Sequence, residues 1–216
     1  PMISYGAWTN AVGSKTELPY FLRTSVANAN FAKELNHLFA VFQWTRIGII
    51  TSSNPGAIDT AEGIFKESGS DKEETKKKAG EVVYTGRFEE LPHDASDTEI
   101  EAAASDRGPN GFATHTEQLK KLGIKIIFIS VFRRSSTRAL FRAFTTAGFT
   151  STGYAFVATY LMGIASNNIP MEEAEGLIML EQEFPPCSPG LFCAEQDARN
   201  AHDAMYALLR GIGKVV

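Results

Sequence analysis

Three polar segments of the chain carry side chains that could bind a small polar molecule. They are "TSSNPG" at 51–56, "SVFRRSS" at 130–136 and "ATYLMG" at 158–163. Hydroxyl groups can donate and accept hydrogen bonds, an arginine pair offers a charged fork, and a tyrosine combines an apolar ring with a polar tip. The alternative for the segment at 130–136, taken alone, is a solvated capping turn.

The chain lacks the motifs that would indicate catalysis. It has no glycine-rich phosphate loop, no dinucleotide fingerprint and no Gly-x-Ser-x-Gly elbow. The four histidines share no metal-ligand spacing, so each is better read as a surface or helix-face residue. We therefore expect no catalytic residues, no cofactor and no metal site. An α/β enzyme is the less favoured alternative, because it would need a catalytic set that these loops do not provide.

The elements that would position these segments alternate along the chain. Apolar runs typical of strands cover 46–51, 81–85, 125–130, 154–158 and 176–180, with helical periodicity over 57–78, 97–104, 116–122 and 137–147. Ser135 or Ser136 can cap the last of these helices, and Gly148 can end it. This alternation predicts an α/β fold with a doubly wound parallel sheet and helices on both faces. The three polar segments would then lie along one edge of the sheet.

Composition narrows the possible partners. The 216 residues are 44% hydrophobic, enough for a sizeable core, and the net charge of −4 argues against a nucleic-acid surface or a polybasic membrane patch. No run of apolar residues is long enough to span a membrane. Cys187 and Cys193 flank the short "SPGLF" loop, so we expect a local disulfide and an oxidising compartment; two free thiols are the alternative.

Two flanking helices are predicted outside the alternating unit. One covers 28–42 and begins at Asn28 as a capping residue, and the other covers 197–212. Each has an apolar stripe that needs a partner, and residues 1–24 supply at most two short strands. We therefore expect a piece of a larger protein. The glycine- and proline-rich stretch at 105–116 is predicted to be a surface loop.

Several segments together resemble a known family. They are "SYGAWT", "FQWTRIGII", "GIKIIFISVFRRSSTRALFRAFTTAGF", "GYAFVATYLMG" and "EEAEGLIML". The chain is similar over nearly its whole length to the ligand-binding region of natriuretic peptide receptors, class C G-protein-coupled receptors and bacterial periplasmic amino-acid-binding proteins. It looks closest to the GABA type B receptors.

The resemblance implies a two-lobed clamshell of doubly wound parallel sheets, with one lobe nearly complete here. Residues 1–43 would belong to lobe 1, residues 44–182 would form lobe 2, and residues 183–216 would cross the hinge and return to lobe 1. The implied function is an extracellular small-molecule ligand-binding domain of a membrane receptor, which signals by lobe closure. The implied partners are a small polar or anionic ligand, a receptor dimer or larger assembly, and a membrane-anchored parent chain.

The resemblance also suggests individual ligand contacts. In lobe 2 these are Ser52, Ser53, Arg133 and Tyr160, of which Arg133 stands where GABA-binding relatives place an aromatic residue.

In lobe 1 the "SYGAWT" segment contributes Trp8, at a position where relatives carry a hydroxyl, and Thr9. Asn28 stands where several relatives place an aspartate that accepts the ligand amine. Both departures argue against an α-amino-acid ligand and strengthen the alternative of a clamshell without a ligand. Two alternatives to a receptor are open. One is a soluble periplasmic-type solute-binding protein, and the other is a clamshell retained for a structural or assembly role without a ligand.

Overall fold

The computed structural model describes residues 2–4, 16, 21–23, 28–68, 80–149, 153–159 and 177–180. The chain divides into two compact units, one made of Pro1–Asn30 with Glu183–Val216 and the other of Phe31–Gln182. In the first unit, β1 (Met2–Ser4) and β2 (Phe21–Arg23) form a short parallel pair. The second unit holds the main sheet and the segments at 51–56 and 130–136.

The main sheet has five strands in the order β4-β3-β5-β6-β7, and every neighbouring pair is parallel. The strands are β3 (Arg46–Ser52), β4 (Glu81–Phe88), β5 (Ile126–Ser130), β6 (Ala155–Thr159) and β7 (Leu177–Leu180). The predicted α/β fold with a parallel sheet is therefore confirmed. Between Ile47 and Gly48 of β3 the register shifts by one residue, so Val83 of β4 is the extra residue of a bulge.

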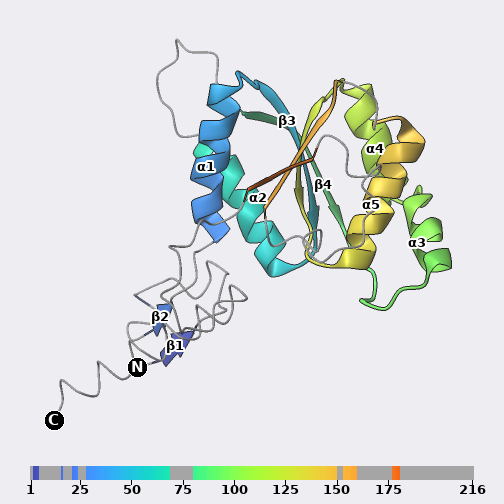
Figure 1. Cartoon of the computed structure of the whole chain (residues 1–216), viewed down its shortest axis with the longest axis horizontal. Coiled ribbons are helices and arrows are strands. Elements are labelled where there is room, and N and C mark those ends of the chain that lie inside the picture. The colour runs from blue at the N-terminus through green and yellow to red at the C-terminus, as the bar shows by residue number, and fades with distance from the viewer. Residues whose placement is uncertain are drawn as a thin grey trace, which may run out of the picture. The chain divides into compact units, whose positions relative to one another are not determined.

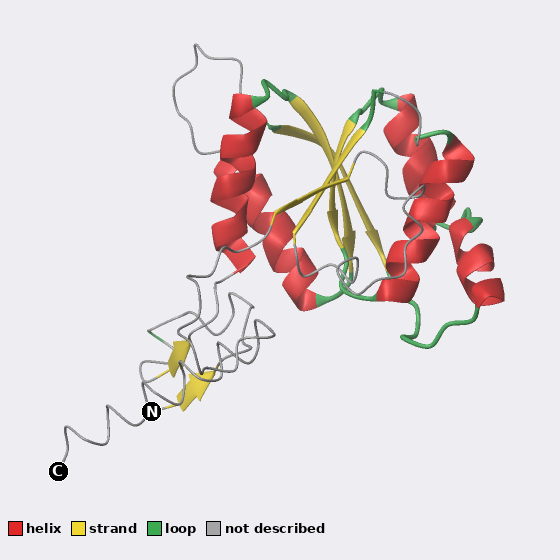
Figure 2. Cartoon of the chain, in the orientation of Figure 1, coloured by secondary structure: helices red, strands yellow, loops and turns green. Residues whose placement is uncertain are grey.

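Helices cover both faces of this sheet. They are α1 (Asn28–Val41), α2 (Pro55–Ser68), α3 (Asp97–Ala104), α4 (Phe112–Lys121) and α5 (Arg134–Ala147). Helices α1 and α2 lie on one face and α4 and α5 on the other, with α3 against α5 (Figures 1 and 2). The alternation of strand residues explains the two layers: Phe128 of β5 packs with α1 and α2, while its neighbours Ile127 and Ile129 pack toward α4 and α5.

Helix α1 packs on this sheet. Ala32, Leu35 and Phe39 are completely buried in one cluster with Ile47 and Ile49 of β3. The sequence analysis assigned residues 1–43 to lobe 1, but this helix finds its apolar partner in the sheet that follows it. The compact unit that holds this sheet begins at Phe31. The assignment of the ranges to two lobes of one clamshell stays a prediction.

The expected surface loop at 105–116 is partly wrong. Helix α4 begins at Phe112, whose side chain is buried and packs against Phe88 at a ring-centroid distance of 4.4 Å. The turn residues at 108–111 hid this start, because glycine, proline and asparagine favour loops. Gly148 does end α5 as predicted, with a left-handed φ of 79°.

Candidate ligand-binding edge

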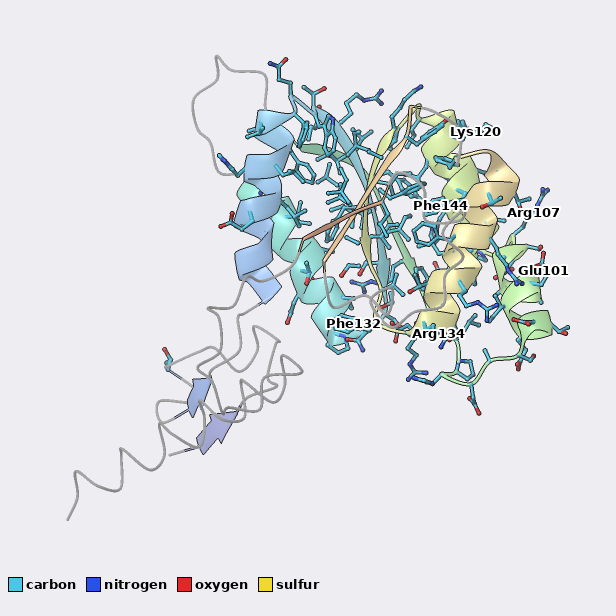
Figure 3. The ribbon with its side chains drawn as sticks, in the orientation of Figure 1. Glu101, Arg107, Lys120, Phe132, Arg134 and Phe144 are labelled. Carbon is cyan, nitrogen blue, oxygen red and sulfur yellow. The ribbon has the colours of Figure 1, made fainter. Side chains whose placement is uncertain are left out.

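The order of the strands indicates where along the sheet a ligand would bind. The chain passes from β3 to β4 on one side and then to β5 on the other side, so the topology reverses between β3 and β5. In open α/β sheets, ligands bind outside the carboxyl ends of the strands at such a reversal. We call this position, with residues 52–54, 89–92 and 131–136, the switch-point edge. Phe132 and Arg134 lie at this end of the sheet, and Lys120 lies at the opposite end (Figure 3).

The carboxylate of Glu90, in the loop after β4, lies at this position. Glu90 follows the carboxyl end of β4, and its Oε1 accepts hydrogen bonds from the backbone N–H groups of Phe132 (2.9 Å) and Arg133 (3.2 Å). Its Oε2 lies 3.3 Å from Nε of Arg133, and the Glu90 side chain is only 8% exposed. A buried carboxylate needs partners of this kind to offset its lost hydration. Glu90 therefore holds the loop after β5 in place.

Arg133 is the predicted ligand contact whose surroundings are clearest. Besides the ion pair with Glu90, its Nη1 donates to the carbonyl of Leu91 at 3.1 Å. Its side chain remains 47% exposed. The guanidinium therefore bonds first to the loop after β4, while its exposed part can still donate to a molecule at the edge.

The two serines that follow also bind the loop after β4. The N–H of Leu91 donates to Oγ of Ser136 at 2.8 Å, and Oγ of Ser135 donates to the carbonyl of Pro92 at 2.6 Å. Neither serine caps α5 as the sequence predicted. The N-cap position is held by Arg133 without a side-chain cap bond. The polar turn thus fastens the loop after β4 to the first turn of α5.

Ser52 and Ser53 differ in accessibility. Ser53 is partly exposed, and its hydroxyl donates to Oε2 of the exposed Glu89 at 2.6 Å. Ser52 is completely buried, and its Oγ has no hydrogen-bond partner among the described residues. A ligand could reach the Ser53–Glu89 pair directly, whereas contact with Ser52 would require the residues that bury it to move.

The other predicted site residues fall largely outside the described part of the chain. Trp8, Thr9 and Tyr160 lie outside it, as does the predicted disulfide between Cys187 and Cys193. For Asn28 the backbone is described, and it is the first residue of α1. The roles of these residues in ligand binding stay predictions. The structure therefore brings together Ser53 and Arg133, through the neighbouring residues Glu89 and Glu90.

Glu89 and Glu90 were missed by the sequence analysis. The predicted strand ended at residue 85, whereas β4 continues to Phe88. The three extra residues move the "EE" pair from an apparent mid-loop position to the same edge as the other polar loops. The segment "GRFEELP" does indicate this later strand end, because the apolar Phe88 stands between charged residues and a proline follows.

Away from this edge, a second polar pair is buried between β4 and α4. Oη of Tyr84 and Nδ1 of His115 lie 2.7 Å apart, and Nε2 of His115 lies 3.0 Å from the carbonyl oxygen of Arg87. Because that carbonyl can only accept, Nε2 carries a proton, and in the neutral ring Nδ1 accepts from Tyr84. Burial lowers the pKa of His115 and raises the pKa of Tyr84.

In the part of the chain that is described, three or more acidic, histidine or cysteine side chains nowhere cluster as a metal ion would require. None of the described helices is both long and apolar enough to cross a membrane.

Comparison with known proteins identifies the family. A search of curated protein sequences finds no match to this chain. The family model described as "Receptor family ligand binding region" matches residues 1–191, which is most of the chain. The parallel five-stranded sheet with its polar carboxyl edge agrees with the type I periplasmic-binding-protein-like fold of that family. The chain belongs to the receptor family ligand-binding region.

Proposed function

We propose that this chain is part of an extracellular domain that binds a small polar molecule and passes the binding event to a membrane-anchored receptor. The membership in the ligand-binding family supports a binding role. The observation that carries the proposal furthest is the switch-point edge, where Ser53, Glu89 and part of Arg133 are accessible beside a fixed loop. Such a preformed polar edge suits ligand binding without catalysis.

The proposed mechanism is lobe closure. A ligand that contacts both lobes stabilises the shut form, because more of its contacts are made there than in the open form. We propose that Trp8, Thr9 and Asn28 supply contacts from lobe 1, and Ser53, Arg133 and Tyr160 supply contacts from lobe 2. The receptor would be GABA type B-like and would act as a dimer or larger assembly.

A direct test is a binding screen on the 216-residue chain. Neutral polyols, amines, amino acids and monocarboxylates are added separately, and the melting temperature is recorded. A ligand that binds only the folded chain raises that temperature with concentration. Small-angle scattering of the chain with the best compound should then show a smaller radius of gyration. If no compound changes the melting temperature, the binding proposal fails.

Arg133 provides a prediction about the site. Replacing it with alanine should weaken binding of a compound found in that screen by about 1–3 kcal/mol, the cost of losing a hydrogen bond to a charged group. Calorimetry measures the change. Arg138→Ala is the matched control, because Arg138 pairs with Asp97 of α3 at 2.8 Å and lies away from the loop after β5. Equal affinity in the two variants would remove Arg133 from the site.

A second candidate function is an assembly role without a ligand. It is favoured by the complete burial of Ser52 and by the bonds that commit Arg133 to Glu90 and Leu91. Under this alternative, no compound in the screen binds, and Arg133→Ala changes only the stability of the fold.

A further inference from the structure

The carboxylate of Glu90 occupies a position that normally suits an anion. Its Oε1 accepts from the backbone N–H groups of Phe132 and Arg133, the two residues directly before α5, at 2.9 and 3.2 Å. Its Oε2 faces the guanidinium of Arg133 at 3.3 Å. Backbone N–H groups at a helix start carry a partial positive charge and attract anions. Three donors that could serve an anionic ligand group, the two N–H groups and Nε of Arg133, are therefore taken by the protein itself.

Glu90 is far along the chain from the donors that it binds. Glu90 belongs to the loop after β4, 43 residues before Arg133, and β4 and β5 lie on opposite sides of β3. Its side chain thus reaches past the end of β3 to the point where the sheet topology reverses. The Glu90 side chain is only 8% exposed. Its contacts with the protein therefore fix its position.

The partners of Glu90 also differ in how firmly they are bound to it. The two backbone donors belong to the main chain directly before α5, whereas the arginine side chain is nearly half exposed. Glu90 therefore keeps two charge-assisted hydrogen bonds even if the guanidinium turns away. A ligand carboxylate that approached the same donors would meet the negative charge of Glu90 and would have to displace it.

We propose that Glu90 is the specificity-determining residue of the switch-point edge, because its carboxylate stands in for a ligand anion and excludes free anions from the start of α5. This inference rests on the proposed ligand-binding function and narrows the class of ligand group that can bind at this position. The expected ligand was polar or anionic; at this position the edge accepts a neutral or cationic polar group.

The test asks whether removing the carboxylate opens an anion site. Glu90→Ala in the 216-residue chain is titrated with sodium acetate, and the backbone amide signals of Phe132 and Arg133 are followed by NMR. Acetate should shift both signals in a saturable manner, at least about tenfold more tightly than in the wild-type chain, as expected for regained charge-assisted hydrogen bonds. Acetamide, a neutral molecule of the same shape, should have no comparable effect.

Three further variants sharpen the result. Glu89→Ala is the matched control, because it removes the neighbouring carboxylate, which bonds to Ser53, and should gain no acetate response at the two amides. Glu90→Ala combined with Arg133→Ala should bind acetate more weakly than Glu90→Ala alone. If Glu90→Ala does not fold, Glu90→Gln keeps an acceptor for the two N–H groups. In that variant acetate should shift the Nε–H signal of Arg133 more strongly than in the wild type.

Two outcomes would overturn the inference. One is a wild-type chain whose Phe132 and Arg133 amides respond to acetate as strongly as those of Glu90→Ala. The other is the absence of any gain in both Glu90 variants. Neither outcome depends on the natural ligand, so a failed compound screen would count against the proposed function and leave this comparison interpretable.

Discussion

His115 is buried in α4, and both of its ring nitrogens have partners. Tyr84 and the carbonyl of Arg87 hold the neutral ring in one orientation. Gly86 leaves room for it, because a Cβ atom at that position would lie 2.7 Å from Nδ1 of the imidazole. A histidine fixed in this way cannot take up a second ring proton without losing the bond that Nδ1 accepts from Tyr84.

This arrangement predicts how stability depends on pH. The pKa of His115 in the folded chain lies below its ordinary value of 6.5, chiefly because of burial. As the pH falls through that ordinary value, the unfolded chain binds a proton that the folded chain does not, so the free energy of unfolding decreases. The slope from this one group is at most about 1.4 kcal/mol per pH unit, and it ends below the folded pKa.

Urea unfolding between pH 7.5 and 5 measures the effect. His115→Gln, which cannot be protonated, should show a smaller loss of stability over the same range. His93→Gln is the control, since His93 is exposed in the loop before α3. If His115→Gln and the wild-type chain lose stability in parallel, His115 is not the group responsible.

At the scale of elements, the order of strands and helices in the sheet unit was predictable. The predicted helix at 97–104 agrees with α3, and the predicted strands overlap β3 to β7. Apolar periodicity carries this information because each element buries one face. The contacts between elements were not predictable. Glu90 and Arg133 are 43 residues apart, and nothing in their local sequence indicates that they meet.

The hydrogen bond between Leu91 and Ser136 allows a test of whether α5 holds the loop after β4 in place. Ser136→Ala removes the oxygen that accepts from the N–H of Leu91, and the serine side chain is completely buried. An N–H group left without a partner costs about 1–3 kcal/mol, so the urea midpoint should fall. The amide of Leu91 should also exchange with solvent faster.

The control for this variant is Ser105→Ala at the exposed end of α3. A surface change of this kind should alter stability by no more than about 0.5 kcal/mol. Equal urea midpoints for the two variants would mean that the loop is held without the Ser136 bond.

At the scale of the whole molecule, the sequence predicted a boundary after residue 43, and α1, which precedes it, packs on the sheet that follows. Residues 28–42 have a clear apolar stripe, yet the stripe does not say which sheet it covers. Packing of Phe39 and Leu35 with Ile47 answers that question. The candidate site was predictable as a sheet edge, because parallel strands share their carboxyl ends. The presence of Glu89 and Glu90 at this edge was not predicted, because the predicted strand ended at residue 85 and β4 continues to Phe88.

The sheet unit should fold without the rest of the chain. Its two hydrophobic clusters lie on opposite faces of the same sheet. Their buried members fall between Ala32 and Ala158, and Leu177 packs against one of the clusters. We expect a fragment of residues 28–182 to unfold in a single cooperative urea transition with helical circular dichroism. A fragment of residues 44–182, which lacks α1, should unfold at lower urea. Equal midpoints would show that α1 contributes little.

The bulge at Val83 has a consequence for how copies of this protein behave in concentrated solution. Within the described residues β4 pairs only with β3, and such an outer strand can recruit a strand from another molecule. The bulge interrupts the regular spacing that a foreign strand would need, and His115 already takes the carbonyl of Arg87. His115, which sets the pH response, thus acts together with the Val83 bulge to discourage sheet-to-sheet aggregation.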